Sequence, residues 1–218
     1  MCAQYTLKTE AAILSGKYKI KVADDVKNIN LRFLPHSFAP VVVAEKNTPK
    51  LTTMKFSLVP AWAKEPRVKF ATYNARIESI TEKPTWRTPF QSQHCLVPLT
   101  AFYESVHNGP EAGHIIELSE QSDQLLFAAG LFDFWKDPKG NQSFFSFAIL
   151  TQAPSPFILA HGHDRTPVFL KGDFAFDWLT LVEKDESHIK ATLLSQAYHP
   201  ELKVSIDRPL KAGWEKRK

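Results

Sequence analysis

Residues 94–105 read HCLVPLTAFYES, a run rich in Val, Leu, Phe and Tyr that is typical of a buried strand. Two turn-forming stretches, HNGPEAG at 107–113 and KDPKGNQ at 136–142, predict hairpins further along the chain. Strand-like runs of the same kind occupy residues 40–46, 55–63, 114–119, 124–135, 143–152 and 165–171. Most of the chain is therefore expected to form β-structure.

Helical patterns are fewer. Residues 173–182 (DFAFDWLTLV) and 187–197 (SHIKATLLSQA) place apolar side chains at spacings near 3.6, which predicts two helices. Runs of strands with a few helices indicate an α+β fold. No repeat, low-complexity tract or flexible linker divides the chain, so we expect one domain over residues 1–218.

The composition is that of a soluble globular protein, with 44% hydrophobic and 23% charged residues. Its net charge of +4 permits a polyanionic partner. Lys and Arg dominate residues 44–107 and acidic residues dominate 111–137, so either one face suits an anion or the charges are merely solvated. No apolar run is long enough for a transmembrane helix, and the N-terminus lacks a signal peptide.

The two cysteines have no paired spacing, which argues against a disulfide framework or a Cys-rich zinc site and fits the cytoplasm. One of them, Cys2, directly follows the initiator Met1. Removal of Met1 would place a free amine and a thiol on one residue. Such a 1,2-aminothiol condenses with an aldehyde and closes a thiazolidine ring. Cys2 is therefore either a nucleophile or an incidental terminal residue.

Two motifs carry further polar candidates. In YNARIES (73–79), Asn74 and Arg76 alternate along an extended stretch, where an amide orients a ligand and a guanidinium binds phosphate. In LTAFYES (99–105), Glu104 follows two aromatic residues, which suits a partly desolvated acid/base. The alternatives are a capping Asn with a surface Arg, and a solvated carboxylate at a strand end.

A third motif, LAHGHDRTPVFL at 159–170, offers His161 and His163 on either side of a glycine, followed by Arg165. The histidine pair lacks a third ligand at a recognisable spacing, so we expect no metal site. An acid/base histidine beside a phosphate-binding arginine is the favoured interpretation, and a plain turn before a strand is the alternative.

The order of these motifs is more specific than any one of them. Met1-Cys2 is followed by FSLVPAWAK (56–64), YNARIES (73–79), HCLVPLTAFYE (94–104) and HDRTPVFL (163–170). This series resembles the SRAP family of abasic-site processing proteins, also called SOS response-associated peptidases. The resemblance runs from Cys2 to about residue 182 and extends toward 198–206. It implies a single SRAP domain of curved, mainly antiparallel sheets with a positively charged cleft.

The resemblance also implies an activity. Family members lose Met1 autocatalytically, and the exposed Cys2 attacks the aldehyde of an abasic site in single-stranded DNA. A covalent thiazolidine crosslink forms and shields the lesion, without a cofactor. The catalytic positions of the family correspond here to Cys2, Asn74, Glu104 and His163.

Other positions correspond to the DNA-binding surface of the family. Arg76 and Arg165 match arginines that hold phosphates, and Trp62 matches an exposed tryptophan. The stretch that begins at Pro40 is expected to line the same groove.

Three positions depart from the family pattern. Ala3 and Gln4 replace a glycine and an arginine, and Ser105 replaces the tryptophan that usually follows the glutamate. The four reactive groups are kept, but a phosphate contact and a stacking surface are lost. Lys69, Lys83 and Arg87 are candidates for compensation.

We therefore expect a cytoplasmic, monomeric protein that processes abasic sites, with self-processing peptidase and lyase-type activity. One alternative is a non-covalent binder of single-stranded nucleic acid, whose binding would not depend on Cys2. The other is a cysteine peptidase that cleaves other proteins in trans.

Overall fold

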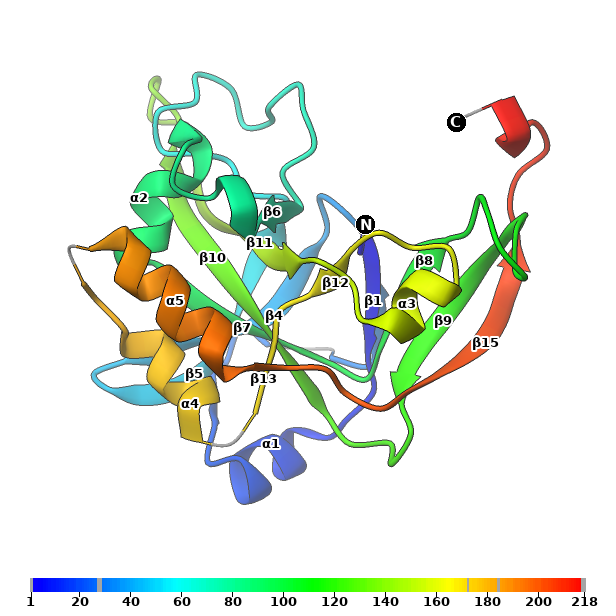
Figure 1. The fold of residues 1–218 in the computed structure, drawn as a ribbon. Helices are drawn as coiled ribbons and strands as arrows, with labels where there is room; N and C mark the ends of the chain where they lie inside the picture. Colours follow the sequence, from blue (N-terminus) through cyan, green and yellow to red (C-terminus); the bar gives the residue numbers. More distant parts are fainter. Residues whose placement is uncertain (1, 27–28, 172, 184, 217–218) are drawn as a thin grey trace.

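The computed structural model describes residues 2–26, 29–171, 173–183 and 185–216, which form two β-sheets with short helices around them (Figure 1). The first sheet has five strands, in the order β15-β9-β8-β1-β3. Their bounds are β15 (Leu202–Pro209), β9 (His114–Glu120), β8 (Ala101–Ser105), β1 (Gln4–Leu7) and β3 (Leu31–Phe33). All of its strand pairs are antiparallel.

The second sheet is larger and closes on itself. Its main path runs β12-β11-β5-β4-β7-β10-β13-β14, with β2 beside β5 and β6 beside β11. The bounds are β2 (Lys21–Val22), β4 (Phe38–Glu45), β5 (Thr48–Phe56), β6 (Asn74–Arg76), β7 (His94–Leu99), β10 (Leu126–Lys136), β11 (Ser143–Gln152), β12 (Thr166–Pro167), β13 (Phe169–Leu170) and β14 (Ala197–Tyr198). An additional pairing of β10 with β11 turns the path β11-β5-β4-β7-β10 into a ring. The expected curvature of the sheets follows from this closure.

The segment 94–105 connects the two sheets. It forms two strands rather than one, because β7 ends at Leu99 and β8 begins at Ala101 in the other sheet. Between them, the Thr100 hydroxyl donates to the Thr6 carbonyl, which ties the crossover to β1. Glu104 on β8 is thereby brought next to the N-terminal strand.

The helices are α1 (Ala11–Lys17), α2 (Pro84–Ser92), α3 (Pro156–Ala160), α4 (Asp173–Asp177) and α5 (Glu186–Gln196), and the 3₁₀ turns are η1 (Ile77–Ser79), η2 (Trp178–Thr180) and η3 (Trp214–Lys216). The predicted helices at 173–182 and 187–197 are confirmed as α4 with η2 and as α5. Sequence patterns did not indicate α1, α2 or α3. In α2, Pro84 opens the first turn and Pro89 lies inside the helix, and internal proline normally argues against a helix.

Two strand predictions need correction. In 55–63 the strand ends at Phe56, because Ser57 takes a φ of 102° and the chain leaves the sheet. In 165–171 the run splits into β12 and β13 around Val168, whose amide and carbonyl bond to Leu150 and Ala129. The predicted hairpins at 107–113 and 136–142 join β8 to β9 and β10 to β11, as expected.

Large aromatic side chains fill the space between the sheets. Tyr5 from β1 contacts Phe33 and Phe56, and Phe56 stacks on Phe147 with ring centroids 5.1 Å apart. Tyr5, Phe56 and Phe147 are completely buried. Burial of such rings is the main source of stability and anchors β1, the strand that follows Cys2.

Candidate active site

Cys2 lies just before β1 and is only 1% exposed. Its position is set by the register of β1 with β8, in which Gln4 faces Tyr103 and Thr6 faces Ala101. The Sγ atom lies 3.8 Å from the carbonyl oxygen of Gln4. Burial raises the pKa of the Cys2 thiol well above its usual range, and the nearby Glu104 carboxylate raises it further. The thiol is therefore protonated at neutral pH.

Glu104 and His163 form a buried acid/base pair. Glu104 is 2% exposed and His163 is 8% exposed. The Nε2 atom of His163 lies 3.5 Å from Glu104 Oε2 and 3.1 Å from the carbonyl oxygen of Ser105. Because a carbonyl oxygen can only accept, Nε2 must carry the hydrogen. In the neutral ring Nδ1 is then an acceptor, and it has no hydrogen-bond partner among the described residues.

The loop that carries His163 is held against the β8–β9 turn. Helix α3 is capped by Ser155 and ends at Ala160, and His161 Nδ1 then lies 3.0 Å from Glu111 Oε2 in the turn. Gly162 has a φ of +78°, and a Cβ there would lie 2.0 Å from the Asn108 carbonyl oxygen. Only glycine allows this approach, so Gly162 fixes the position of the neighbouring His163.

Asn74 begins the short strand β6, which pairs in parallel with β11. Its side chain is nearly buried, and neither amide atom has a partner in the described part of the chain. Buried polar atoms are nearly always hydrogen-bonded, so a side chain in this state is ready to bind a ligand. The pKa of the preceding Tyr73 is raised, mainly by burial and further by the charges of Glu104 and Cys2, so its hydroxyl lies within electrostatic range of both groups.

Tyr73, Glu104 and His163 line a small cavity of about 260 Å³, and Cys2 and Asn74 adjoin it through their chain neighbours Ala3 and Tyr73. Its lining residues are Ala3, Gln4, Tyr73, Tyr103, Glu104, Ser105, His107, Ile115 and His163. A water molecule takes about 30 Å³ of liquid, so the cavity holds a small organic group rather than a single solvent molecule. Cys2, Glu104 and His163 are thus brought together, with Asn74 attached through its neighbour Tyr73.

The predicted DNA-binding residues fall into two groups. Arg76 and Lys83 are exposed, and Trp62 is 60% exposed, so all three offer surface to a nucleic acid. Pro40 is instead buried within β4, opposite Thr53. Arg165 is also buried and makes a two-pronged ion pair of 2.8 Å with Glu78. Contact of Arg165 with phosphate stays a prediction, and it would require this pair to open or be shared.

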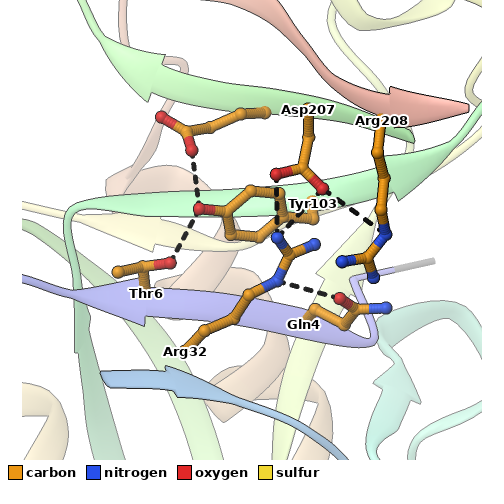
Figure 2. A network of polar contacts seen from close by, with 7 residues as sticks. Gln4, Thr6, Arg32, Tyr103, Asp207 and Arg208 are labelled. Atoms are coloured by element: carbon orange, nitrogen blue, oxygen red, sulfur yellow. Dashed lines mark hydrogen bonds and ion pairs between the residues drawn. The ribbon is translucent and has the colours of Figure 1, made fainter. Parts of the chain in front are cut away.

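Sequence reasoning missed a polar network beside the cavity, which Figure 2 shows. Arg32 on β3 donates from Nε to Gln4 Oε1 at 3.0 Å and from one terminal nitrogen to both oxygens of Asp207 at 2.9 Å. Its guanidinium lies 3.5 Å from the centre of the Tyr103 ring. Arg32 and Asp207 are far apart in the sequence, so no local pattern could have paired them.

The comparisons with known proteins agree with the geometry. The model of the SRAP family, SOS response associated peptidase, matches residues 1–206, so the chain belongs to this family. The abasic site processing protein YoqW of Bacillus subtilis is 26% identical over 195 residues, covering 88% of this chain and 86% of that protein. The abasic site processing protein HMCES of Gallus gallus is 30% identical over 179 residues, covering 68% and 53%.

Solved structures show the same fold. A protein from Bordetella bronchiseptica superposes with a TM-score of 0.78 at 18% identity, covering 95% of this chain and all of the other. A protein from Bacteroides thetaiotaomicron gives 0.75 at 18% identity, covering 100% and 95%. The predicted family and α+β fold are thus confirmed.

The described residues contain no group of three or more His, Cys, Asp or Glu side chains placed to hold a metal ion. Within the same residues, every helix is too short or too polar to cross a membrane.

Proposed function

We propose that the protein captures abasic sites in single-stranded DNA as a covalent thiazolidine on Cys2. The relatives that share its family are named abasic site processing proteins. The observation that carries the proposal is the burial of Cys2 within electrostatic reach of Glu104, beside a cavity that Glu104 and His163 line. Removal of Met1 is part of the proposal, and Met1 lies outside the described residues.

The reaction needs no oxidant or metal. The ring-opened abasic sugar presents an aldehyde carbon, and the Cys2 amine attacks it to form a C–N bond. The carbonyl oxygen accepts protons and leaves as water, which gives an iminium ion. The Cys2 sulfur then adds to the same carbon, the S–H proton is released, and the five-membered ring closes. One water is lost overall and no electrons are transferred.

The raised pKa of the Cys2 thiol favours this order of events. A protonated thiol is a weak nucleophile, so the amine acts first. When the sulfur adds, its proton must move to a base, and Glu104 is close enough to lower the thiol's acidity electrostatically. When His163 is protonated at Nδ1, it can supply the proton that the departing oxygen needs, while Nε2–H stays on the Ser105 carbonyl. Asn74 is left to bind a sugar hydroxyl through its unpartnered amide.

Single-stranded DNA fits the exposed candidates. Trp62 can stack on an unpaired base, and Arg76 and Lys83 can pair with phosphates. Self-removal of Met1 and β-elimination at the lesion belong to the same proposal, since both use the Cys2 end and the acid/base pair. A peptidase acting in trans is disfavoured, because it would need a readily formed thiolate.

The test is a crosslinking assay with a single-stranded oligonucleotide that carries one abasic site. Intact mass first establishes which protein molecules have lost Met1. Wild type without Met1 should give a shifted band that survives heat and detergent. The matched control is Cys95→Ala, which removes the other cysteine, buried in β7, and should crosslink as well as wild type.

Cys2→Ala separates the roles of amine and thiol. In Cys2→Ala molecules that lack Met1 by intact mass, the free amine can still form a Schiff base, which borohydride should trap, but it cannot form a heat-stable ring. A heat-stable band of wild-type intensity from Cys2→Ala would overturn the proposal. No band from wild type that has lost Met1 would also overturn it and would favour a non-covalent single-strand binder.

A further inference from the structure

The chain continues past the part that matches the family model, which ends at residue 206. The last described segment, residues 207–216, completes β15 and continues past the β8–β9 turn to η3 (Figure 1). The Leu210 amide donates to the Gly113 carbonyl at 2.7 Å. The Trp214 ring lies on the backbone of Gly113, where a Cβ would come within 3.1 Å of it, and its centroid is 5.9 Å from the His107 ring. Segment 207–216 is therefore packed on the β8–β9 turn.

Segment 207–216 lines a second cavity of about 420 Å³. This cavity shares Gln4, Ser105, His107 and Ile115 with the active-site cavity, so the two cavities are adjacent. Gln4 and Ser105 are the two positions where the arginine and the tryptophan of the family pattern are missing. Both residues line the second cavity together with side chains of segment 207–216.

The new wall consists of Arg208, Lys211 and Trp214. Arg208 is more than half exposed, and its only described ion pair is a long one, 3.8 Å to Asp207. Asp207 is itself occupied by two 2.9 Å hydrogen bonds from Arg32 (Figure 2). The negative charge of Asp207 is therefore largely neutralised by Arg32. The cations of Arg208 and Lys211 face the cavity and solvent.

An aromatic ring beside two cations is the arrangement that binds one nucleotide of an unpaired strand. The ring stacks on the base, and the cations pair with the phosphate. The acidic and apolar alternatives fit poorly, because an acidic peptide offers no planar base for Trp214 and a purely apolar ligand leaves both cations unused.

We propose that segment 207–216 is a second DNA-binding element that holds the nucleotide next to the abasic site. Trp214 stacks on its base, and Arg208 and Lys211 bind its phosphate. This inference rests on the proposed function for the identity of the strand. Segment 207–216, rather than Lys69, Lys83 or Arg87, then compensates for the arginine and the tryptophan that are absent at Gln4 and Ser105. None of those three residues lines either cavity.

Binding and crosslinking are measured separately, so that the two proposals can fail independently. Affinity is measured by fluorescence polarisation with an oligonucleotide that carries a stable tetrahydrofuran analogue, which has no aldehyde. Trp214→Ala should weaken binding about 5- to 100-fold, and Trp214→Phe should restore most of it. Arg208→Gln with Lys211→Gln should reduce the slope of log K against log salt by about 0.7, the value for one phosphate of a single strand. The control Lys46→Gln, in the β4–β5 turn, should change neither.

Strand polarity distinguishes contact from a structural effect. The cavity lies on one side of the active site, so oligonucleotides extended only 5′ or only 3′ of the analogue should respond differently. Trp214→Ala should weaken binding to one of them and leave the other within about 2-fold of wild type, with an unchanged melting temperature. Equal affinity of wild type and all variants, while wild type crosslinks normally, would overturn this inference alone. Absence of crosslinking by wild type, with the Trp214 effect present, would overturn only the covalent function.

Discussion

Replacement of Gly162 by alanine tests how His163, the proposed acid/base histidine, is held in place. A φ of +78° costs an alanine about 1 kcal/mol, because its Cβ crowds the backbone. The same Cβ would lie 2.0 Å from the Asn108 carbonyl oxygen, which is rigid backbone rather than a flexible side chain. Overpacking of this kind adds about 1–3 kcal/mol. The free energy of unfolding should therefore fall by roughly 2–4 kcal/mol, which lowers the melting temperature by about 10 °C in a chain of this length.

The displaced loop also carries His163, whose Nε2 lies 3.1 Å from the Ser105 carbonyl. A shift of about 1 Å at this point should slow crosslinking about 100-fold. Gly140→Ala is a matched control, because Gly140 has nearly the same φ, +77°, but no atom within 4 Å of its Cβ position. It should lower the melting temperature by only about 2–4 °C and leave the crosslinking rate unchanged. If Gly162→Ala is as stable and as active as Gly140→Ala, the close approach does not position His163.

Three other perturbations have defined outcomes. Glu104→Gln removes a negative charge that raises the pKa of Cys2, so alkylation of Cys2 in a Cys95→Ala background should begin at lower pH, and an unchanged pH profile would contradict the assignment. Burial lowers the pKa of His94 to about 4, so stability present above about pH 6.5 should be lost as the pH falls toward 4, by roughly 3 kcal/mol. Thermal melts of His94→Phe should lack this loss. Burial raises the pKa of Glu78 and the hydrogen bond from Arg165 lowers it, with a net fall; the Glu78 side chain is 53% exposed, so solvent screens the pair and Glu78→Ala should cost about 1 kcal/mol at pH 7. That difference should begin to shrink as the pH falls below about 4.3 and vanish below the lowered pKa, and chemical denaturation at pH 7 and at low pH checks it.

Local composition was sufficient for several elements. The runs at 114–119, 124–135 and 143–152 appear as strands, as their apolar and aromatic content predicts, and in the helix predicted at 187–197 the buried residues Ile189 and Leu193 lie four apart, about one turn. The helix predicted at 173–182 also appears in the structure. Helix α2 could not be predicted in this way. Pro84 suits the first turn, but the internal Pro89 opposes a helix locally, and packing of Trp86 and Phe90 into the core outweighs that preference.

For the candidate active site too, some features could be predicted from the sequence and others could not. Chemical type and motif order were enough to select Cys2, Asn74, Glu104 and His163, since each is a reactive or orienting group in a distinctive local sequence. Their shared environment was not predictable, because it depends on which strands pair. The register of β1 with β8 places Cys2 near Glu104, and Gly162 places His163 beside them. The buried state of Pro40 and Arg165 is likewise a result of packing.

Residue types and their local order established the family and the α+β class and supplied the candidate reactive groups. Long-range packing brings Arg32 to Gln4 and Asp207, and Trp214 to Gly113. Both contacts join segments more than 25 residues apart in the chain. Such contacts follow from the closure and curvature of the sheets, which no local pattern encodes.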